Sequence, residues 1–126
     1  MNQMPMIHRG NDDIRKQWTP MERLEHDVDA ILADLKRILL RKQEDYGPLN
    51  ISLAPGGALN GLRVRMYDKL ARFSHLYEKG NDTPNYESIA DTFVDIANYA
   101  IIALLVQRGQ WEGSERGTEA KSRSTQ

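Results

Sequence analysis

Three carboxylates and one amide recur along a predicted helix at a spacing that places them on one face. Glu87, Asp91, Asp95 and Asn98 stand at positions i, i+4, i+8 and i+11, and no Lys or Arg lies between Glu87 and Val106. Because a helix turns by about 100° per residue, the four side chains fall within one narrow arc. Like charges at i,i+4 disfavour a helix by about 0.2–0.5 kcal/mol per pair. The spacing therefore predicts that a metal ion or basic side chains from elsewhere neutralise this acid stripe.

The acid stripe has two interpretations. Most polar stripes are solvated faces. A solvated face usually mixes charges of both signs, whereas this one is acidic, and its arc continues into Ile102 and Leu105 within a segment, residues 100–106, that is apolar all round. A polar stripe that leads directly into buried surface is more typical of a cleft than of bulk water, so a metal or ligand site and a solvated face both remain open from the pattern alone.

A basic ridge lies on the preceding predicted helix. Arg65, Lys69 and Arg72 share one side of that helix, with Asp68 and His75 just beyond them. The basic ridge has three interpretations: a solvated face, a set of partners for Glu87 and Asp91 in the acid stripe, or a grip on phosphate oxygens. Polyphosphate chemistry needs both carboxylates that hold Mg²⁺ and cations that neutralise the phosphate oxygens. The coexistence of the two patterns favours such chemistry.

Three helices must position these residues. The first is predicted at residues 20–44, after a capping box of Thr19 and Glu22 with Pro20 at the first helical position. Lys42 lies on the apolar face of this helix, near its C-terminal end. Its amine is therefore expected to point toward whatever the core encloses at that end. A loop of about a dozen residues follows, and the second and third helices are predicted at residues 59–79 and 86–108. No strand pattern is visible, so the expected fold is an all-α helical bundle.

The predicted domain covers residues 19–109. We expect residues 1–18 to form a flexible arm, with Trp18 docking beside the first helix, and residues 110–126 to form a disordered tail, because they are rich in Gly, Ser, Thr and balanced charge. Three helices of this size cannot cover all of their apolar faces, so we expect a homodimer or homotetramer. The predicted interface is the apolar end of the third helix: Ile101, Ile102, Leu104, Leu105 and Val106.

Composition narrows the classes of partner. The 126 residues carry a net charge of −1 and no cysteine, which argues against nucleic acid as a partner and excludes disulfides and Cys-ligated zinc. Residues 100–106 are too few to span a bilayer, which needs about 20 apolar residues, and the N-terminus lacks the apolar region of a signal peptide. We therefore expect a cytoplasmic protein that binds neither nucleic acid nor membrane.

Two further motifs carry little weight. His26 and Asp27 suggest an HD-type metal phosphohydrolase, but the only upstream histidine, His8, lies in the expected arm. Glu22 and Glu25 match a Glu-x-x-Glu pattern, although the capping box already accounts for Glu22. The glycines of the loop are not a P-loop, because no Gly-Lys-Ser/Thr follows them.

Three ordered segments carry a resemblance to a known family: KQEDYG at residues 42–47, GLRVRMYDKLAR at 61–72 and ESIADTFVDIANY at 87–99. Over roughly residues 35–106 the chain resembles the phage and bacterial nucleotide modification associated domain 1, which is similar to MazG-like all-α nucleoside triphosphate pyrophosphohydrolases. MazG-like enzymes hold Mg²⁺ with Glu-x-x-Glu on one helix and Glu-x-x-Asp on the next. Here Asp91 and Asp95 are four residues apart, and only Asp68 corresponds to the first pair.

The resemblance implies Mg²⁺-dependent (or Mn²⁺-dependent) attack of water on a nucleoside triphosphate, giving monophosphate and pyrophosphate. Metal would be held by Asp68, Glu87, Asp91 and Asp95, of which Glu87, Asp91 and Asp95 are the expected catalytic residues. Substrate would be bound by Lys42, Asp45, Tyr46, Asn50, Arg65, Lys69, Arg72 and Asn98. Two alternatives remain open: a non-catalytic nucleotide-binding protein that uses the same pocket, and a structural bundle in which the charges pair with one another.

Overall fold

The computed structural model describes residues 14–80 and 86–113, without the side chains of residues 86–88. Within these ranges all regular structure is helical and no strand occurs, which confirms the all-α class. Helices α2 (Pro20–Tyr46), α4 (Ala58–Lys79) and α5 (Tyr86–Gln107) follow the three predicted helices closely. The short helix α3 (Leu49–Ser52) lies where the sequence predicts only a loop. The MazG-like arrangement and the assembly into oligomers stay predictions.

Helix boundaries follow from local chemistry. At the start of α2, the Thr19 amide donates to Glu22 Oε1 at 2.8 Å, and the Glu22 amide donates to Thr19 Oγ1 at 3.1 Å. These two hydrogen bonds are the predicted capping box, which satisfies two amides that have no partner inside the helix. Gly57 precedes α4 with φ of +95° and Gly80 follows it with φ of +71°, a region that side chains with a Cβ rarely adopt.

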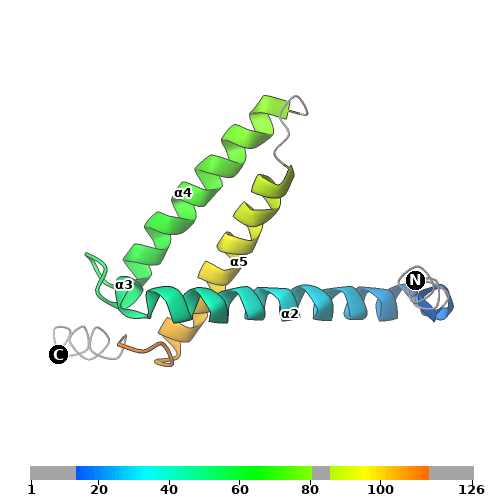
Figure 1. Ribbon diagram of the computed structural model, residues 1–126, viewed down its shortest axis with the longest axis horizontal. Helices are drawn as coiled ribbons and strands as arrows, with labels where there is room; N and C mark the ends of the chain where they lie inside the picture. Colours follow the sequence, from blue (N-terminus) through cyan, green and yellow to red (C-terminus); the bar gives the residue numbers. More distant parts are fainter. Residues whose placement is uncertain (1–13, 81–85, 114–126) are drawn as a thin grey trace, which may run out of the picture. The chain divides into compact units, whose positions relative to one another are not determined.

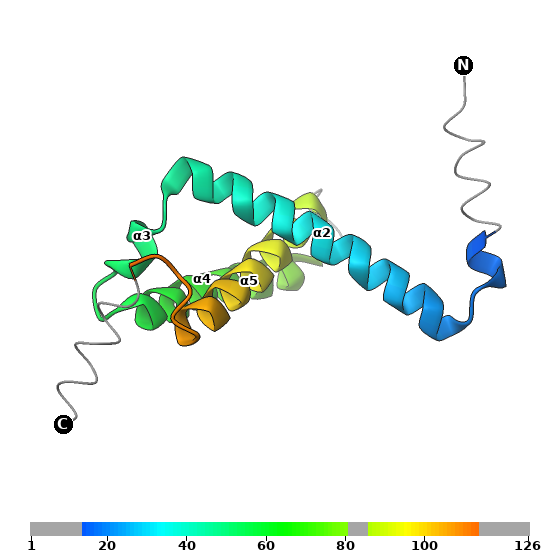
Figure 2. The same ribbon diagram turned by 90° about the horizontal axis from the view of Figure 1, so that it is seen from below.

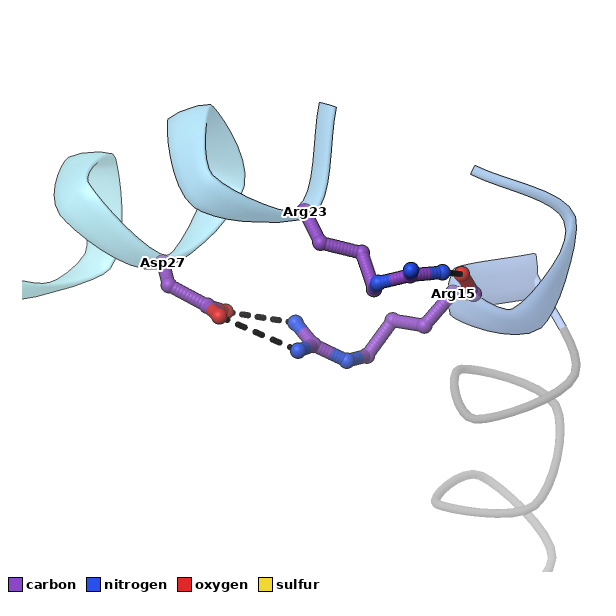
Figure 3. A network of polar contacts seen from close by, with 3 residues as sticks. All are labelled: Arg15, Arg23 and Asp27. Carbon is purple, nitrogen blue, oxygen red and sulfur yellow. Dashed lines mark hydrogen bonds and ion pairs between the residues drawn. The ribbon is translucent and has the colours of Figure 1, made fainter. Parts of the chain in front are cut away.

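The chain divides into two units, residues 1–36 and residues 37–126, and the boundary falls inside α2. In the first unit, a helical turn at residues 14–17 is tied to α2 by the Arg15 guanidinium, which donates to both carboxylate oxygens of Asp27 (Figure 3). Arg23 donates to the carbonyl oxygens of Arg15 and Trp18 at 3.2 and 2.8 Å. The Trp18 ring lies 4.8 Å from the ring of His26, which confirms that Trp18 docks beside the first helix. Residues 14–18 are therefore held against α2, whereas the rest of the predicted arm lies outside the described residues.

In the second unit, α4 and α5 lie side by side and run in opposite directions (Figures 1 and 2), and α3 packs on α4. A cluster of buried apolar side chains joins α3, the start of α4 and the end of α5: Ile51, Leu62, Ile102, Val106 and Trp111. Leu39 from the last part of α2 packs against this cluster. The core of the second unit therefore lies at one end of the α4–α5 pair.

Trp111 corrects the predicted end of the domain. Its side chain is only 6% exposed, and its indole N–H donates to the Pro48 carbonyl at 3.3 Å. The Ser52 hydroxyl donates to the Glu112 carbonyl, so a second bond holds the same segment against α3. The ordered fold continues through residue 113 instead of ending at residue 109, and the remainder of the predicted tail lies outside the described residues.

The burial of α5 narrows the predicted interface. Ile102 and Val106 are buried within the chain, at 6% and 7% exposure, so they belong to the core and are not free to contact a second subunit, whereas Leu104 is 53% exposed. A larger set of exposed apolar side chains lies on the first half of α2. There an apolar stripe of five side chains is 43–70% exposed: Met21, Leu24, Val28, Ile31 and Leu32.

Candidate functional site

A cavity of about 350 Å³ opens beside the core of the second unit. The last turns of α2, the segment that includes α3, and the facing sides of α4 and α5 all contribute to its wall. Its lining combines aliphatic, aromatic, amide and charged side chains: Leu39, Lys42, Gln43, Tyr46, Gly47, Asn50, Ile51, Arg65, Lys69, Asp95, Asn98, Tyr99 and Ile102. Pockets of this size and mixed character bind small molecules.

Asp95 lies at the centre of the charges in this pocket. Its Oδ1 accepts a hydrogen bond from Lys42 Nζ at 2.8 Å, and its Oδ2 lies 2.9 Å from Lys69 Nζ. The Asp95 side chain is 17% exposed, against 53% for Lys42 and 32% for Lys69. The basic side chains that the acid stripe requires are therefore Lys42 and Lys69, which arrive from two other helices.

The pKa values of this group follow from that geometry. Burial would raise the pKa of the Asp95 carboxyl, but the hydrogen bonds from Lys42 and Lys69 and their positive charges together outweigh it and hold the pKa below its ordinary value of 3.8. The hydrogen bond to Asp95 raises the pKa of Lys42 above its ordinary value of 10.5, against the opposing effect of burial. The lowered pKa of Asp95 and the raised pKa of Lys42 keep both of these groups charged at neutral pH.

Helical spacing explains why these side chains meet. Arg65 and Lys69 are four residues apart on α4, and Asn98 and Tyr99 follow Asp95 by three and four residues on α5. Each set therefore points to one side of its helix. Because α4 and α5 lie side by side, the two sets line the same cavity. Lys42 reaches Asp95 from the far end of α2, as its position on the apolar face of that helix predicts.

Two buried polar atoms in the pocket wall have no hydrogen-bond partner. These are Asn98 Oδ1, on a side chain that belongs to a residue only 7% exposed, and Arg65 Nη1. The other terminal nitrogen of Arg65 donates to the Asn50 carbonyl at 3.3 Å. Buried polar atoms in folded proteins are nearly always paired. An unpaired acceptor and an unpaired donor beside one cavity therefore indicate a polar ligand.

A second, more open hollow of about 400 Å³ adjoins the pocket. Arg65, Lys69 and Tyr99 line both of them, and Asp68 and Arg72 complete the second. Across the two hollows, four basic side chains face two carboxylates, so the combined surface favours an anion.

The structure gathers most of the predicted substrate-binding residues. Seven predicted site residues line the pocket: Lys42, Tyr46, Asn50, Arg65, Lys69, Asp95 and Asn98. Asp68 and Arg72 line the adjoining hollow, Asp45 and Asp91 are exposed and line neither, and the side chain of Glu87 lies outside the described residues. The sequence reasoning did not single out Gln43 or Tyr99. Their positions one residue after Lys42 and four after Asp95 are the signals that could have identified them.

The predicted metal site fits this arrangement poorly. Both oxygens of Asp95 already face ammonium groups, Asp68 lines the other hollow, and Asp91 is exposed. Among residues 14–80 and 86–113, no three His, Cys, Asp or Glu side chains gather as ligands for a metal. The donor set of the described residues does not fit a divalent cation, so the metal site stays a prediction.

Helix α5 has a further property. One segment of the described chain, Ile89–Gln107, is long and apolar enough to cross a membrane by length and composition alone. The prediction from residues 100–106 alone finds no such segment. Of the segment, 22% is buried, and it includes Asp95, ion-paired to two lysines, and the buried Asn98.

Comparison with known proteins gives one family. The model of the nucleotide modification associated domain 1 family matches residues 42–106, just over half of the chain. No curated protein and no solved structure matches. The matched segment begins at Lys42 and includes every residue that lines the pocket except Leu39. The chain therefore belongs to the nucleotide modification associated domain 1 family.

Proposed function

We propose that this chain binds a nucleotide, with the phosphate groups held by Lys42, Lys69 and Arg65. One observation carries the proposal: three basic side chains and a single carboxylate line a cavity of about 350 Å³ in which an Arg65 N–H still lacks a partner. Charge-assisted hydrogen bonds to phosphate contribute about 1.5–3 kcal/mol each. The family name, which refers to nucleotide modification, supports the same class of ligand.

The two ends of the ligand have different requirements. The phosphate end is attracted to the basic side of the pocket and to the adjoining hollow, where Arg72 adds a further cation. For the base end, the same pocket offers the ring of Tyr46 for stacking and the polar groups of Asn50 and Asn98. Because the two hollows together accommodate more than one phosphate, we propose a nucleoside triphosphate as the ligand.

A second candidate function is the pyrophosphohydrolase reaction: hydrolysis of a nucleoside triphosphate to monophosphate and pyrophosphate, with Mg²⁺ or Mn²⁺. The observation in its favour is the acid stripe, since Asp95 lines the pocket and Asp91 is one turn earlier on α5. Because the described side chains do not form a site for a divalent ion, the ion would have to bind together with the nucleotide, whose phosphate oxygens it would neutralise. The chain's own contribution is to hold the phosphates with Lys42, Lys69 and Arg65 and to orient the base.

A binding and turnover experiment tests both candidates. Calorimetry of the full chain with each common NTP and dNTP, with and without Mg²⁺, measures affinity, and chromatography of the same mixtures detects monophosphate and pyrophosphate. We expect Lys42→Met to weaken triphosphate binding by about tenfold or more, because it removes one charge-assisted contact. Lys36→Met, an exposed change on the same helix, is the matched control and should bind as the wild type does.

The outcomes separate the three interpretations. Binding without turnover supports the non-catalytic nucleotide-binding protein, and turnover supports the pyrophosphohydrolase. A folded protein that binds no nucleotide, with or without Mg²⁺, would leave only the structural bundle.

The assembly is proposed on separate grounds. The apolar stripe of α2, from Met21 to Leu32, is exposed in the described chain, and an exposed stripe of this size is typical of an interface. We propose a homodimer or homotetramer in the cytoplasm. Light scattering tests it: Ile31→Glu should lower the measured mass, whereas Ala33→Glu, an exposed change outside the apolar stripe, should not. A wild-type monomer at micromolar concentration would contradict the proposal.

A further inference from the structure

The Asp95 carboxylate occupies the position that an anionic ligand would be expected to take. Its two oxygens lie 2.8 and 2.9 Å from the ammonium nitrogens of Lys42 and Lys69, one oxygen to each. Two oxygens of a phosphate group would bridge the same two ammonium groups in the same manner. The carboxylate of the protein and the phosphate of a ligand therefore compete for one pair of donors.

We propose, on the basis of the nucleotide-binding function above, that Asp95 is an internal competitor that weakens the binding of every phosphate ligand, so that only a polyphosphate, with its additional contacts, binds well. A ligand must displace the Asp95 carboxylate from Lys42 and Lys69 before it can use them. A ligand with a single phosphate does not offset that displacement, whereas a chain of phosphates does.

The side chains that move in this exchange are the lysines. Lys42 and Lys69 are 53% and 32% exposed, and each carries its charge on a flexible four-carbon stem. Asp95 has a short side chain on α5 and is only 17% exposed. The ammonium groups can therefore turn toward a ligand in the cavity while the Asp95 carboxylate stays against the helix.

The exchange has a cost, and a ligand binds well only if it makes additional contacts that offset this cost. A partly buried carboxylate that loses its cationic partners is destabilised, and a single phosphate replaces two contacts by two contacts of the same kind. A longer phosphate chain also reaches the unpaired Arg65 Nη1 and, in the adjoining hollow, Arg72. These additional contacts offset the displacement of Asp95.

The same geometry has an alternative: Asp95 could instead orient the two lysines for a ligand that binds beside it. The two roles predict opposite effects of one substitution. Asp95→Asn keeps the shape of the side chain and removes its negative charge, so it strengthens phosphate binding if Asp95 competes and weakens it if Asp95 orients.

Calorimetry with inorganic pyrophosphate and with orthophosphate, in the presence of EDTA, tests the proposal on the full chain. We expect Asp95→Asn to bind both anions at least tenfold more tightly than the wild type and by a similar factor, because the cost of displacing Asp95 is common to both. The control is Glu44→Gln, which makes the same chemical change at an exposed position outside the cavity. It should stay within about twofold of the wild type, because exposed charges are strongly screened.

Each outcome decides a specific point. Unchanged or weaker binding by Asp95→Asn overturns the internal competitor while leaving the nucleotide-binding function in place. A wild type that binds orthophosphate as tightly as pyrophosphate also overturns it. A folded wild type that binds neither anion and no nucleotide removes the proposed function itself.

A measurement on the wild type keeps the test independent of how the variant folds. With side-chain NMR at a single pH, pyrophosphate should shift the signals of the Asp95 carboxyl carbon and of the Lys42 and Lys69 side-chain nitrogens together. Lysine signals that shift while the Asp95 signal stays fixed would mean that the lysines keep Asp95 as their partner, and the proposal would be wrong.

Discussion

Two aspartates of this chain are held by basic side chains, and the two arrangements differ in kind. Asp27, in the first unit, has both of its oxygens bound by one guanidinium, that of Arg15, and its side chain is 51% exposed. Asp95, in the second unit, has one oxygen on each of two ammonium groups, and its side chain is 17% exposed. Both contacts lower the pKa of the carboxyl, in Asp27 chiefly through the hydrogen bonds from Arg15.

The contrast separates a charge pair that serves the structure from one that can serve ligand binding. The planar fork of Arg15 matches one carboxylate, lies on the surface and ties residues 14–17 to α2. The two lysines at Asp95 line a cavity, and each carries its charge on a flexible stem. The first arrangement serves local folding, whereas the second places two cations beside a cavity, where a ligand can compete for them.

The largest expected effect comes from removing both lysines. Lys42→Met with Lys69→Met leaves Asp95 as a partly buried carboxylate without its cations, and breaking such a group costs about 3 kcal/mol, or about 10 °C in melting temperature. Thermal unfolding followed by circular dichroism measures the loss. Adding Asp95→Asn to the pair should restore most of it, because no charge is then left unpaired. A double variant with the melting temperature of the wild type would contradict this prediction. It would mean that Asp95 without its cations costs no more stability than an exposed carboxylate does.

A smaller effect is expected from pH. Because the pKa of Asp95 is lowered on folding, its contribution to stability is present above its ordinary value of 3.8 and is lost as the pH falls through the folded value. The raised pKa of Lys42 makes its contribution present below 10.5 and lost as the pH rises through the folded value. Denaturant unfolding across pH should therefore show a steeper acid loss in the wild type than in Asp95→Asn. Parallel acid limbs would contradict the assignment.

A conservative change of one lysine tests whether the type of cation matters at Asp95. Lys69→Arg keeps the charge but introduces the planar fork that Arg15 presents to Asp27. If a fork holds its carboxylate more firmly than an ammonium does, Lys69→Arg should melt at or slightly above the wild-type temperature and bind pyrophosphate several-fold more weakly. Calorimetry and thermal unfolding of the same preparation measure the two effects. Equal or tighter pyrophosphate binding would mean that the type of cation does not matter at this site.

The smallest effect is expected at the surface pair. Arg15→Met should leave the melting temperature of the chain unchanged within error, since exposed ion pairs contribute little. Hydrogen exchange of residues 14–18 should become faster, because their tie to Asp27 is lost. A clear fall in melting temperature would mean that the Arg15–Asp27 contact stabilises more of the chain than residues 14–18.

Helical periodicity was sufficient to predict much of the site. The spacing of Asp95 and Asn98 along α5, and the position of Lys42 on the apolar face of α2, led directly to residues that line the pocket. The capping box of Thr19 and Glu22 likewise predicted where α2 begins. These features are local, so one helix at a time determines them.

The remainder depends on which helix faces which. A helical arc wide enough to include both Asp91 and Asp95 does not tell which of them meets a lysine, and only Asp95 lies against Lys42 and Lys69. Ile102 belongs to one buried cluster with Trp111, a single aromatic residue in a segment whose composition is typical of a tail. The four-residue α3 lies among Gly and Pro, where periodicity is too short to detect.

The two tryptophans of the chain give each unit its own optical probe. Trp18 lies beside α2 in the first unit, and Trp111 is buried in the second, where its indole N–H reaches the Pro48 carbonyl between two residues of the pocket wall, Gly47 and Asn50. Trp18→Phe would leave Trp111 as the sole source of indole emission. The wavelength and intensity of the Trp111 emission would then report, without any label, when a ligand disturbs the segment that contributes Gly47 and Asn50 to the pocket wall.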